Sequence, residues 1–274
     1  MSSPVLADNV FKRFLVYTGR WIIGFLEGLT DIVYLSGMVL RNVFILPFQG
    51  QPLRWEKIFQ DLDEIGVKSL SIILITSFSI GMILVFVLAR QLQPLGAETS
   101  VPAFVTLVLT RELAPLLSGI VLAGRVGASI TAKMGTQKVN EEILALEIMA
   151  IDPVGYLVTP KVVAAVIMLP CLTVIADAVG LFGGFVVGTF GLGIDMSRYW
   201  LNTVHALSKS DIFVGLLKSL IFGIIISMIG TYEGITVEGG AQEVGRATMM
   251  SVMTSTIMII VADAIVTGVF YAFS

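Results

Sequence analysis

The chain has 274 residues, of which 56% are hydrophobic and 14% are charged, with a formal net charge of −3. Soluble domains carry roughly 25% charged residues, so this composition indicates a membrane protein. The acidic balance argues against nucleic-acid binding, which normally needs a clustered basic surface. A single cysteine and a single histidine exclude an internal disulfide framework and a histidine-rich metal site, and no metal site is expected.

The first part of the chain has an amphipathic pattern. Within Val10–Val39, apolar residues recur near helical spacing with charged residues between them. This pattern predicts a helix that lies in the membrane interface, with its apolar side in lipid and its charges among the headgroups. The alternative is a sixth span over Trp21–Leu40, which would bury Glu27 and Asp31 at a cost of a few kcal/mol each. We favour the interfacial helix.

Five later stretches are each long and apolar enough to cross a bilayer core of about 30 Å, which needs about 20 residues in a helix. The predicted spans are Ser69–Leu92, Val101–Gly124, Val162–Leu192, Ile212–Tyr232 and Thr254–Phe273. The predicted fold is therefore all-α. We expect residues 1–66 to form an N-terminal interfacial segment and residues 67–274 to form a membrane domain.

The basic residues set the predicted orientation. Lys and Arg in short loops resist translocation across the membrane, whereas Asp and Glu count for little. With a cytoplasmic N-terminus, most of the 17 basic residues lie on the inner side, and the outer loops hold only Arg90, Arg198 and Lys209. The sequence therefore predicts a multi-pass protein with a cytoplasmic N-terminus and a C-terminus on the opposite side.

The stretch Ala132–Pro153, AKMGTQKVNEEILALEIMAIDP, is unusually polar for this chain. We expect Asn140 to cap a short helix, Glu141 and Glu142 to complement the positive end of its dipole, and Asp152 to mark its end. Such an amphipathic helix is too short to span a membrane. It is either a connection packed on the bilayer surface or a docking element for a soluble partner, and the residues alone leave both open.

Catalytic motifs are missing from the sequence. It contains no GxxxxGK[ST] phosphate loop, no GxSxG nucleophile elbow and no HExxH metal motif. We therefore expect no enzymatic activity, no catalytic residue and no cofactor on this chain. If nucleotide drives its action, the motor is another subunit.

Arg111 and Glu112 lie about eleven residues into the second predicted span, or about 15 Å along a helix, which is near its middle. A guanidinium at this depth can bind a lipid phosphate through paired hydrogen bonds. Because adjacent side chains point about 100° apart on a helix, we expect no direct ion pair between the two residues. The alternative role is structural pairing with Asp177, Lys218 or Asp263 on other spans.

Two further patterns lie within the spans. Gly180, Gly184 and Gly188 recur at four-residue intervals, which predicts close helix packing, with a hinge or gate as the alternative. Asp177 and Asp263 supply a second functional hypothesis, a proton-coupled secondary transporter that uses intramembrane carboxylates.

The run Leu109–Lys161 resembles the MlaE (YrbE) permeases, the membrane subunits of ABC transporters that work with MCE-domain proteins. The likeness lies in the order of its motifs: RELAP, AGRVG, a Gly-Thr-x-Lys-Val turn, a glutamate-led helix ending in DP, and TP before the next span. It extends more loosely from Val67 to the C-terminus. The resemblance implies an amphipathic N-terminal helix followed by five transmembrane helices, with a cytoplasmic coupling helix between the second and third.

The resemblance also implies a function. A permease homodimer would move phospholipid or a related hydrophobic lipid between membranes, together with two ATPase subunits that bind ATP and Mg and with an MCE ring. The expected location is a bacterial inner membrane, with a plastid envelope as the alternative. Arg111 and Glu112 would then lie on the translocation path, and the three glycines at a dimer or helix contact. The resemblance places the coupling helix at about Thr136–Ile151, and the residues implied in ATPase coupling in and next to it are Gly135, Thr136, Lys138, Glu141, Glu142, Leu146 and Asp152.

Two residues depart from the family pattern. Lys133 stands where the family usually has an acid, and Glu142 stands where it usually has a neutral amide. We expect the partner surface to carry a matching basic residue.

Overall fold

The computed structural model describes residues 28, 30–45 and 54–273, and within these ranges the chain forms helices and turns without a strand. Five helical stretches are long and apolar enough to cross a membrane, which confirms the predicted number of spans. They are Trp55–Leu95, Glu98–Val139, Val154–Gly191, Lys209–Ile235 and Ala241–Ala272. The fold is an all-α membrane fold, as the sequence predicts.

The long stretches are divided into shorter helical elements. The α-helices are α2 (Trp55–Ile65), α3 (Leu70–Leu92), α4 (Val101–Val108), α5 (Ala114–Leu122), α6 (Ala128–Val139), α7 (Glu142–Ile148), α8 (Thr159–Val186), α9 (Met196–Ala206), α10 (Lys209–Ile235) and α11 (Ala241–Phe273). Short 3-10 helices are η2 (Val67–Ser69), η3 (Gln93–Leu95) and η4 (Glu98–Ser100). The π-helical turns are η5 (Leu109–Leu113), η6 (Ala123–Gly127), η7 (Val154–Val158) and η8 (Val187–Gly191).

The helices extend beyond the apolar segments that predicted them. The second predicted span ends at Gly124, but the helical chain continues through η6 and α6 to Val139. The last predicted span begins at Thr254, whereas α11 begins at Ala241. Hydropathy marks the part of a helix that lipid covers, while backbone hydrogen bonds can carry the helix further into water.

Two of the four π-turns in the described part of the chain coincide with the family-like motifs. The turn η5 has the sequence LTREL and ends just before Ala114 and Pro115, so it contains most of RELAP, and η6 is AGRVG itself. Pro115 has no N–H group, and its ring crowds the carbonyl of Arg111 one turn earlier, which favours a local widening of the helix. The sequence pattern therefore marks places where the backbone leaves regular α-helix.

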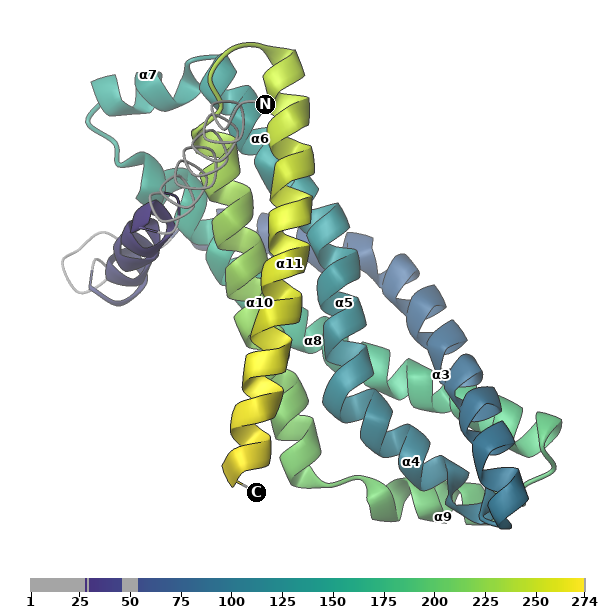
Figure 1. Cartoon of the computed structure of the whole chain (residues 1–274). Coiled ribbons are helices and arrows are strands. Elements are labelled where there is room, and N and C mark those ends of the chain that lie inside the picture. The colour runs from purple at the N-terminus through teal and green to yellow at the C-terminus, as the bar shows by residue number, and fades with distance from the viewer. Residues whose placement is uncertain (1–27, 29, 46–53, 274) are drawn as a thin grey trace, which may run out of the picture.

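The helix α10 lies at the centre of the bundle and α11 at its edge. In the apolar 18-residue stretch of α10, 56% is buried inside the protein, whereas the corresponding share for α11 is only 11%. The helix α8 packs against α3 and α10, and α10 also contacts α6 and α11 (Figure 1). The apolar surface of α11 is thus largely open to lipid or to another protein chain.

The glycine face of α8 packs within the chain. A Cβ added to Gly81 of α3 would lie 1.8 Å from the carbonyl oxygen of Gly180, so only glycine permits this crossing of α3 and α8. A Cβ on Gly184 would lie 3.1 Å from the hydroxyl oxygen of Tyr199, and one on Gly188 would lie 2.1 Å from its ring. Gly180, Gly184 and Gly188 therefore face α3 and α9 of the same chain.

The N-terminal helix is described over residues 30–44. Its Leu35 and Val39 are buried in the main core, and it lies at the same end of the molecule as α7 (Figure 1). Asn42 donates from Nδ2 to Oδ2 of Asp152 at 3.2 Å and lies 3.4 Å from Oγ1 of Thr159. The remaining part of the predicted interfacial helix, and of the alternative sixth span, lies outside the described residues.

Candidate functional site

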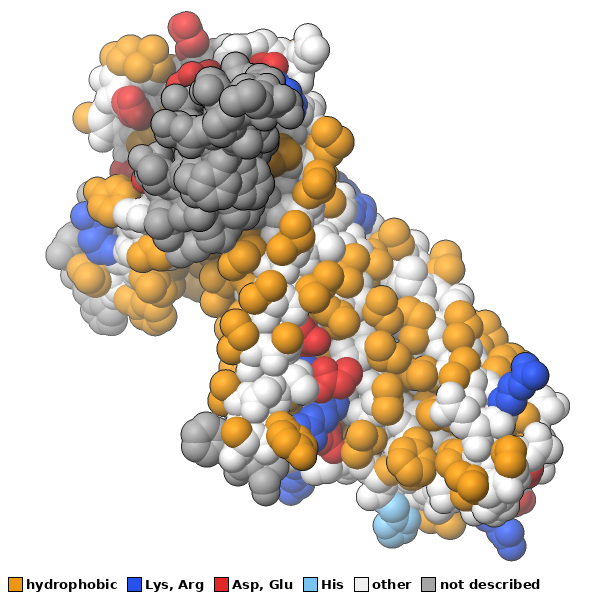
Figure 2. Space-filling model, viewed as in Figure 1, with side chains coloured by type: hydrophobic (Ala, Val, Ile, Leu, Met, Phe, Trp, Pro, Cys, Tyr) orange, Lys and Arg blue, Asp and Glu red, His pale blue; other side chains and the backbone are white. Residues whose placement is uncertain are grey.

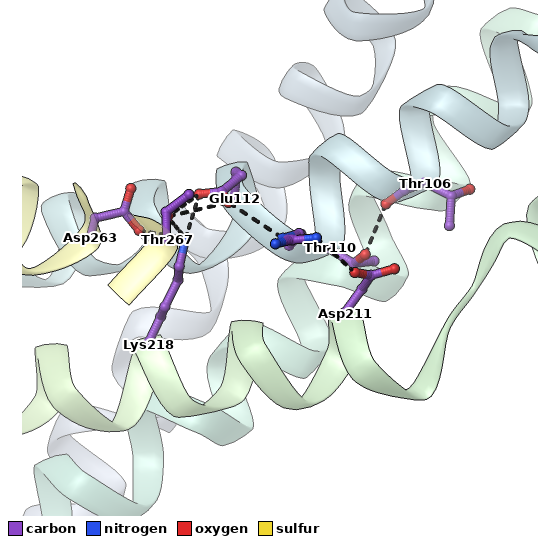
Figure 3. A network of polar contacts seen from close by, with 8 residues as sticks. Thr106, Thr110, Glu112, Asp211, Lys218, Asp263 and Thr267 are labelled. Carbon is purple, nitrogen blue, oxygen red and sulfur yellow. Dashed lines mark hydrogen bonds and ion pairs between the residues drawn. The ribbon is translucent and has the colours of Figure 1, made fainter. Parts of the chain in front are cut away.

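A charged cluster joins three spans around Lys218, a fully buried residue of α10. Its Nζ lies 2.9 Å from Oδ1 of Asp263 and 2.7 Å from Oγ1 of Thr267, both on α11. The same amine contacts a carboxylate oxygen of Glu112 in η5 (Figure 3). Thr267 in turn lies 3.2 Å from Oε2 of Glu112, so Lys218, Glu112 and Thr267 each have more than one partner.

These contacts match the chemistry of a lysine amine. The ammonium group has three N–H donors, and three oxygen-bearing side chains surround it. A buried charge is tolerated only when it is paired and hydrogen-bonded. Lys218 therefore ties η5, α10 and α11 together inside the membrane region.

Arg111 extends this cluster toward the beginning of α10. Its Nη1 lies 3.6 Å from Oδ1 of Asp211, in the first turn of α10, and its Nε lies 3.8 Å from Oε1 of Glu112. The prediction that Arg111 and Glu112 cannot pair is wrong. It assumed regular α-helix, whereas both residues lie in the π-turn η5, where the angle between successive side chains differs and the long arginine can reach its neighbour.

The π-turn η5 lies in close contact with α10. A Cβ added to Gly215 of α10 would lie 2.4 Å from the carbonyl oxygen of Thr110, so this glycine lets α10 approach the backbone of η5. Asp211 and Lys218 are separated by about two turns, or 10 Å along α10. Arg111 thus contacts the first turn of α10, and Glu112 contacts α10 about two turns later, at Lys218.

The cluster is partly open to the outside. The side chains of Arg111 and Glu112 are 27% and 31% exposed, whereas Lys218 is fully enclosed. In Figure 2 a small group of acidic and basic side chains interrupts the hydrophobic surface beside the C-terminal half of α11. The guanidinium of Arg111 is partly exposed and makes only long contacts to its two carboxylates, so it retains N–H donors that can bind a phosphate group. The buried lysine meanwhile holds the helices together.

The sequence hypotheses are met in part. Of the predicted structural partners, Lys218 contacts Glu112 directly and Asp263 joins the cluster through Lys218, whereas no hydrogen bond or ion pair among the described residues joins Asp177 to it. The buried Oδ1 of Asp177 has no hydrogen-bond partner in the described part of the chain.

Sequence reasoning missed Asp211 and Thr267. Asp211 precedes Lys218 by seven residues and Thr267 follows Asp263 by four, so each pair lies on one helix face. This helical spacing is the sequence pattern that could have identified Asp211 and Thr267 as neighbours of Lys218 and Asp263. Asp211 lies one residue before the predicted fourth span, so it does not stand out as a charge within the membrane.

The segment between the second and third spans contains the short helix α7. Ile143 is buried and Leu146 is half-buried against the main core, whereas Leu144 and Ile148 are 50% and 78% exposed. The prediction that Asn140 caps this helix is wrong. Asn140 instead ends α6, and Glu141 takes the N-cap position with a left-handed φ of 59° and no side-chain cap.

Asp152 serves the next helix rather than the end of α7. Its Oδ1 accepts from the backbone N–H of Val154 at 3.1 Å, and its Oδ2 accepts from that of Gly155 at 3.0 Å. The helix α7 itself ends at Ile148, before Ala150 adopts a φ of 58°. The predicted stop at Asp152 is therefore wrong, because the chain has already left helical geometry.

The predicted coupling residues divide into inward-facing and outward-facing groups. Gly135 is buried, and a Cβ there would lie 3.1 Å from Val244 and 3.3 Å from Val237. Thr136 and Lys138 belong to α6 and are exposed. The outward-facing residues around α7 are Glu141, Glu142, Leu144, Glu147, Ile148 and Met149, which form an acidic and apolar surface without a basic residue.

Comparison with known proteins supports the sequence resemblance. Residues 58–269 match the family described as Permease MlaE. A probable ABC transporter permease protein of Rickettsia felis is 40% identical over 220 residues, covering 80% of this chain and 85% of the relative.

More distant relatives cover similar lengths. The chloroplastic protein TRIGALACTOSYLDIACYLGLYCEROL 1 of Arabidopsis thaliana is 33% identical over 237 residues, which are 86% of this chain and 68% of the relative. The intermembrane phospholipid transport system permease protein MlaE of Haemophilus influenzae is 32% identical over 263 residues, which are 94% of this chain and 98% of the relative. The chain therefore belongs to the MlaE permease family.

Proposed function

We propose that this chain is the membrane permease of an ABC transporter that moves phospholipid, with ATP hydrolysed by separate subunits. The observation that carries the lipid role is the partly exposed pair Arg111 and Glu112, which lies on a hydrophobic surface and is anchored by the buried Lys218. A phospholipid carries a phosphate beside apolar chains, so such a surface can contact both parts of one molecule. The family membership agrees with this role.

The proposed docking surface for the ATPase is the outward side of α7. Leu144 and Ile148 present an apolar stripe, while Glu141, Glu142 and Glu147 surround it with negative charge. An amphipathic helix of this kind fits an apolar groove with a basic rim. The inward residues Ile143 and Leu146 join the helix to the bundle, so a push on α7 reaches the spans.

The complete transporter would contain two copies of this chain, two ATPase subunits with ATP and Mg, and an MCE-domain ring. The largely exposed face of α11 is available for a second copy or for lipid. We place the protein in a bacterial inner membrane, with its N-terminus and α7 on the cytoplasmic side. Reporter fusions at each terminus test this orientation, and a periplasmic signal from the N-terminal fusion contradicts it.

Co-purification from the native operon tests ATPase docking. The paired substitution Glu141→Lys with Glu142→Lys reverses the charge beside α7, and we expect it to release the ATPase while the permease remains folded. The matched control is Glu98→Lys, an exposed acid at the opposite end of the first two spans. Equal ATPase recovery from both variants contradicts docking at α7.

Reconstitution separates the proposed function from its alternative. Vesicles that contain the wild-type complex should transfer phospholipid when ATP is supplied, and Arg111→Gln should reduce that transfer by about tenfold or more. Transport by the chain alone under a proton gradient, without ATP, would instead favour the carrier that uses Asp177 and Asp263. Asp263→Asn distinguishes the two further, because loss of proton coupling is expected only for the carrier.

A further inference from the structure

A second charged region lies where α2, α6 and the beginning of α8 meet. These elements enclose a cavity of about 90 Å³. The charged residues that line it are Asp61, Glu64, Lys68, Arg125, Lys133 and Lys161. Arg125 follows Glu112 by 13 residues along the same helical run, or about 20 Å, so the cavity is separate from the charged cluster.

Two of the cavity cations are paired with carboxylates. Nζ of Lys161, a residue only 7% exposed, lies 3.3 Å from Oδ1 of Asp61. Lys133 pairs with Glu64, which also accepts from the hydroxyl of Ser129 at 3.1 Å. Each carboxylate of the cavity wall thus has one cation partner, and Oδ2 of Asp61 has no hydrogen-bond partner among the described residues.

The other two cations leave a surplus of positive charge. Arg125 donates from Nη1 to the hydroxyl of Ser69, and among the described residues neither Arg125 nor Lys68 has a carboxylate within 4.0 Å. Four cations therefore face two carboxylates around a small, partly enclosed space. The surrounding protein has a low dielectric constant and therefore concentrates the electric field of these cations, which attracts an anion.

The cavity lies at the level where the spans begin and end. Lys68 immediately precedes the first predicted span, Arg125 immediately follows the second, and Lys161 immediately precedes the third. Lipid phosphates lie at this boundary, where long basic side chains also reach the headgroups. Three separate helical segments thus each place one cation at the level of the lipid headgroups, and these cations line one cavity.

The helix α2 adds a membrane-facing side to the same region. It directs Asp61 and Glu64 to the cavity, while Trp55 and Phe59 are 59% and 65% exposed on other sides of the helix. Exposed aromatic residues on an amphipathic helix are typical of the membrane interface. An anion that reaches the cavity from the bilayer would therefore be a lipid headgroup.

We propose that the cavity between α2, α6 and α8 is a binding site for a phosphate group, carried by an anionic lipid of the adjacent leaflet. Arg125 supplies the planar fork that suits phosphate oxygens, and Lys68 supplies a flexible charge at the rim. The proposal concerns binding at this site alone and holds whether or not the charged cluster carries lipid.

Thermal stability of the detergent-solubilised full chain measures the binding. The probes are dihexanoyl phosphatidic acid, dihexanoyl phosphatidylcholine and inorganic phosphate, each titrated while the unfolding midpoint is followed. We expect phosphatidic acid to raise the midpoint most, because its phosphate carries no attached cation. Lys68→Gln and Arg125→Gln should each weaken its apparent affinity by roughly tenfold.

Controls separate this site from general charge effects. Arg246→Gln removes a cation that is 75% exposed on α11 and does not line the cavity, so this variant should bind phosphatidic acid as the wild type does. Arg125→Lys retains the charge without the fork and should lose less affinity than Arg125→Gln. Equal weakening in all these variants would overturn the proposal.

Glu64→Gln is expected to increase the affinity, a result that a folding defect would not produce. It removes a negative charge from the wall and frees Lys133, so the affinity for phosphatidic acid should rise several-fold. Unchanged or weaker binding overturns the proposal. If inorganic phosphate binds with the same variant pattern and phosphatidic acid does not, the site takes a free anion; if neither probe binds, the assignment of a phosphate site is wrong.

Discussion

The two charged regions of this protein differ in how their charges are balanced. In the charged cluster, two cations, Arg111 and Lys218, face the three carboxylates Glu112, Asp211 and Asp263. In the cavity, four cations face two carboxylates. The cluster therefore uses its buried cation to join helices, whereas the cavity retains positive charge for a ligand. Loss of the buried Lys218 should therefore reduce stability most, and loss of Lys68 or Arg125 should reduce binding.

The largest expected effect is that of Lys218→Met. This change leaves Glu112 and Asp263 without their shared buried cation, and breaking a buried pair in this way costs about 3–5 kcal/mol. Denaturant unfolding of the solubilised protein measures the loss. The control Lys209→Met, at an exposed position on the same helix, should stay within about 0.5 kcal/mol of the wild type. Similar losses in both variants would mean that Lys218 has no special structural role.

The next effect is that of Lys161→Met in the cavity. Lys161 is nearly as buried as Lys218 but pairs with one carboxylate, Asp61, so the expected loss is about 1–3 kcal/mol. The double variant with Asp61→Asn should recover part of that loss, because no unpaired charge remains. A double variant less stable than Lys161→Met would contradict this explanation.

Arg111→Gln should separate function from stability. Its contacts to Asp211 and Glu112 are long, at 3.6 and 3.8 Å, and its side chain is 27% exposed. We expect a loss of stability below about 1 kcal/mol, as for other partly exposed ion pairs. ATP-dependent lipid transfer should fall much further. A variant that transfers lipid at the wild-type rate removes Arg111 from the lipid path.

The smallest effect on stability is expected for Lys133→Met. Its side chain is 47% exposed, so loss of its pair with Glu64 should change the free energy of unfolding by about 0–1 kcal/mol. The unpaired Glu64 should nevertheless reduce the affinity for phosphatidic acid, opposite in sign to Glu64→Gln. Affinities that change in the same direction would contradict the charge balance proposed for the cavity.

Some features of the site were predictable from local sequence patterns. Arg111, Glu112, Lys218 and Asp263 stand out because charged residues are rare in apolar spans. Asp211 and Thr267 lie at helical spacing from two of them, but that spacing alone names no partner on another helix. The contacts depend on how η5, α10 and α11 are placed relative to one another.

The errors around α7 have a similar origin. Asn140 and Asp152 are both good capping residues, and sequence preference assigns them to the ends of one helix. In the folded chain, Glu141 and Ala150 adopt left-handed conformations, so α7 is shorter than expected. Asp152 is then free to cap the following helix and to accept from Asn42, a residue 110 positions away.

The sequence by itself determined the membrane class, the five spans and the family, because hydrophobic length and motif order are local properties of the chain. Only the tertiary structure decided which charges meet. It brought Lys218 to Glu112 and Asp263, and it gathered Lys68, Arg125 and Lys161 from three span boundaries into one cavity. The physical reason is that contacts between helices depend on their tilt, their close crossings at glycine and their π-turns, which hydropathy does not encode.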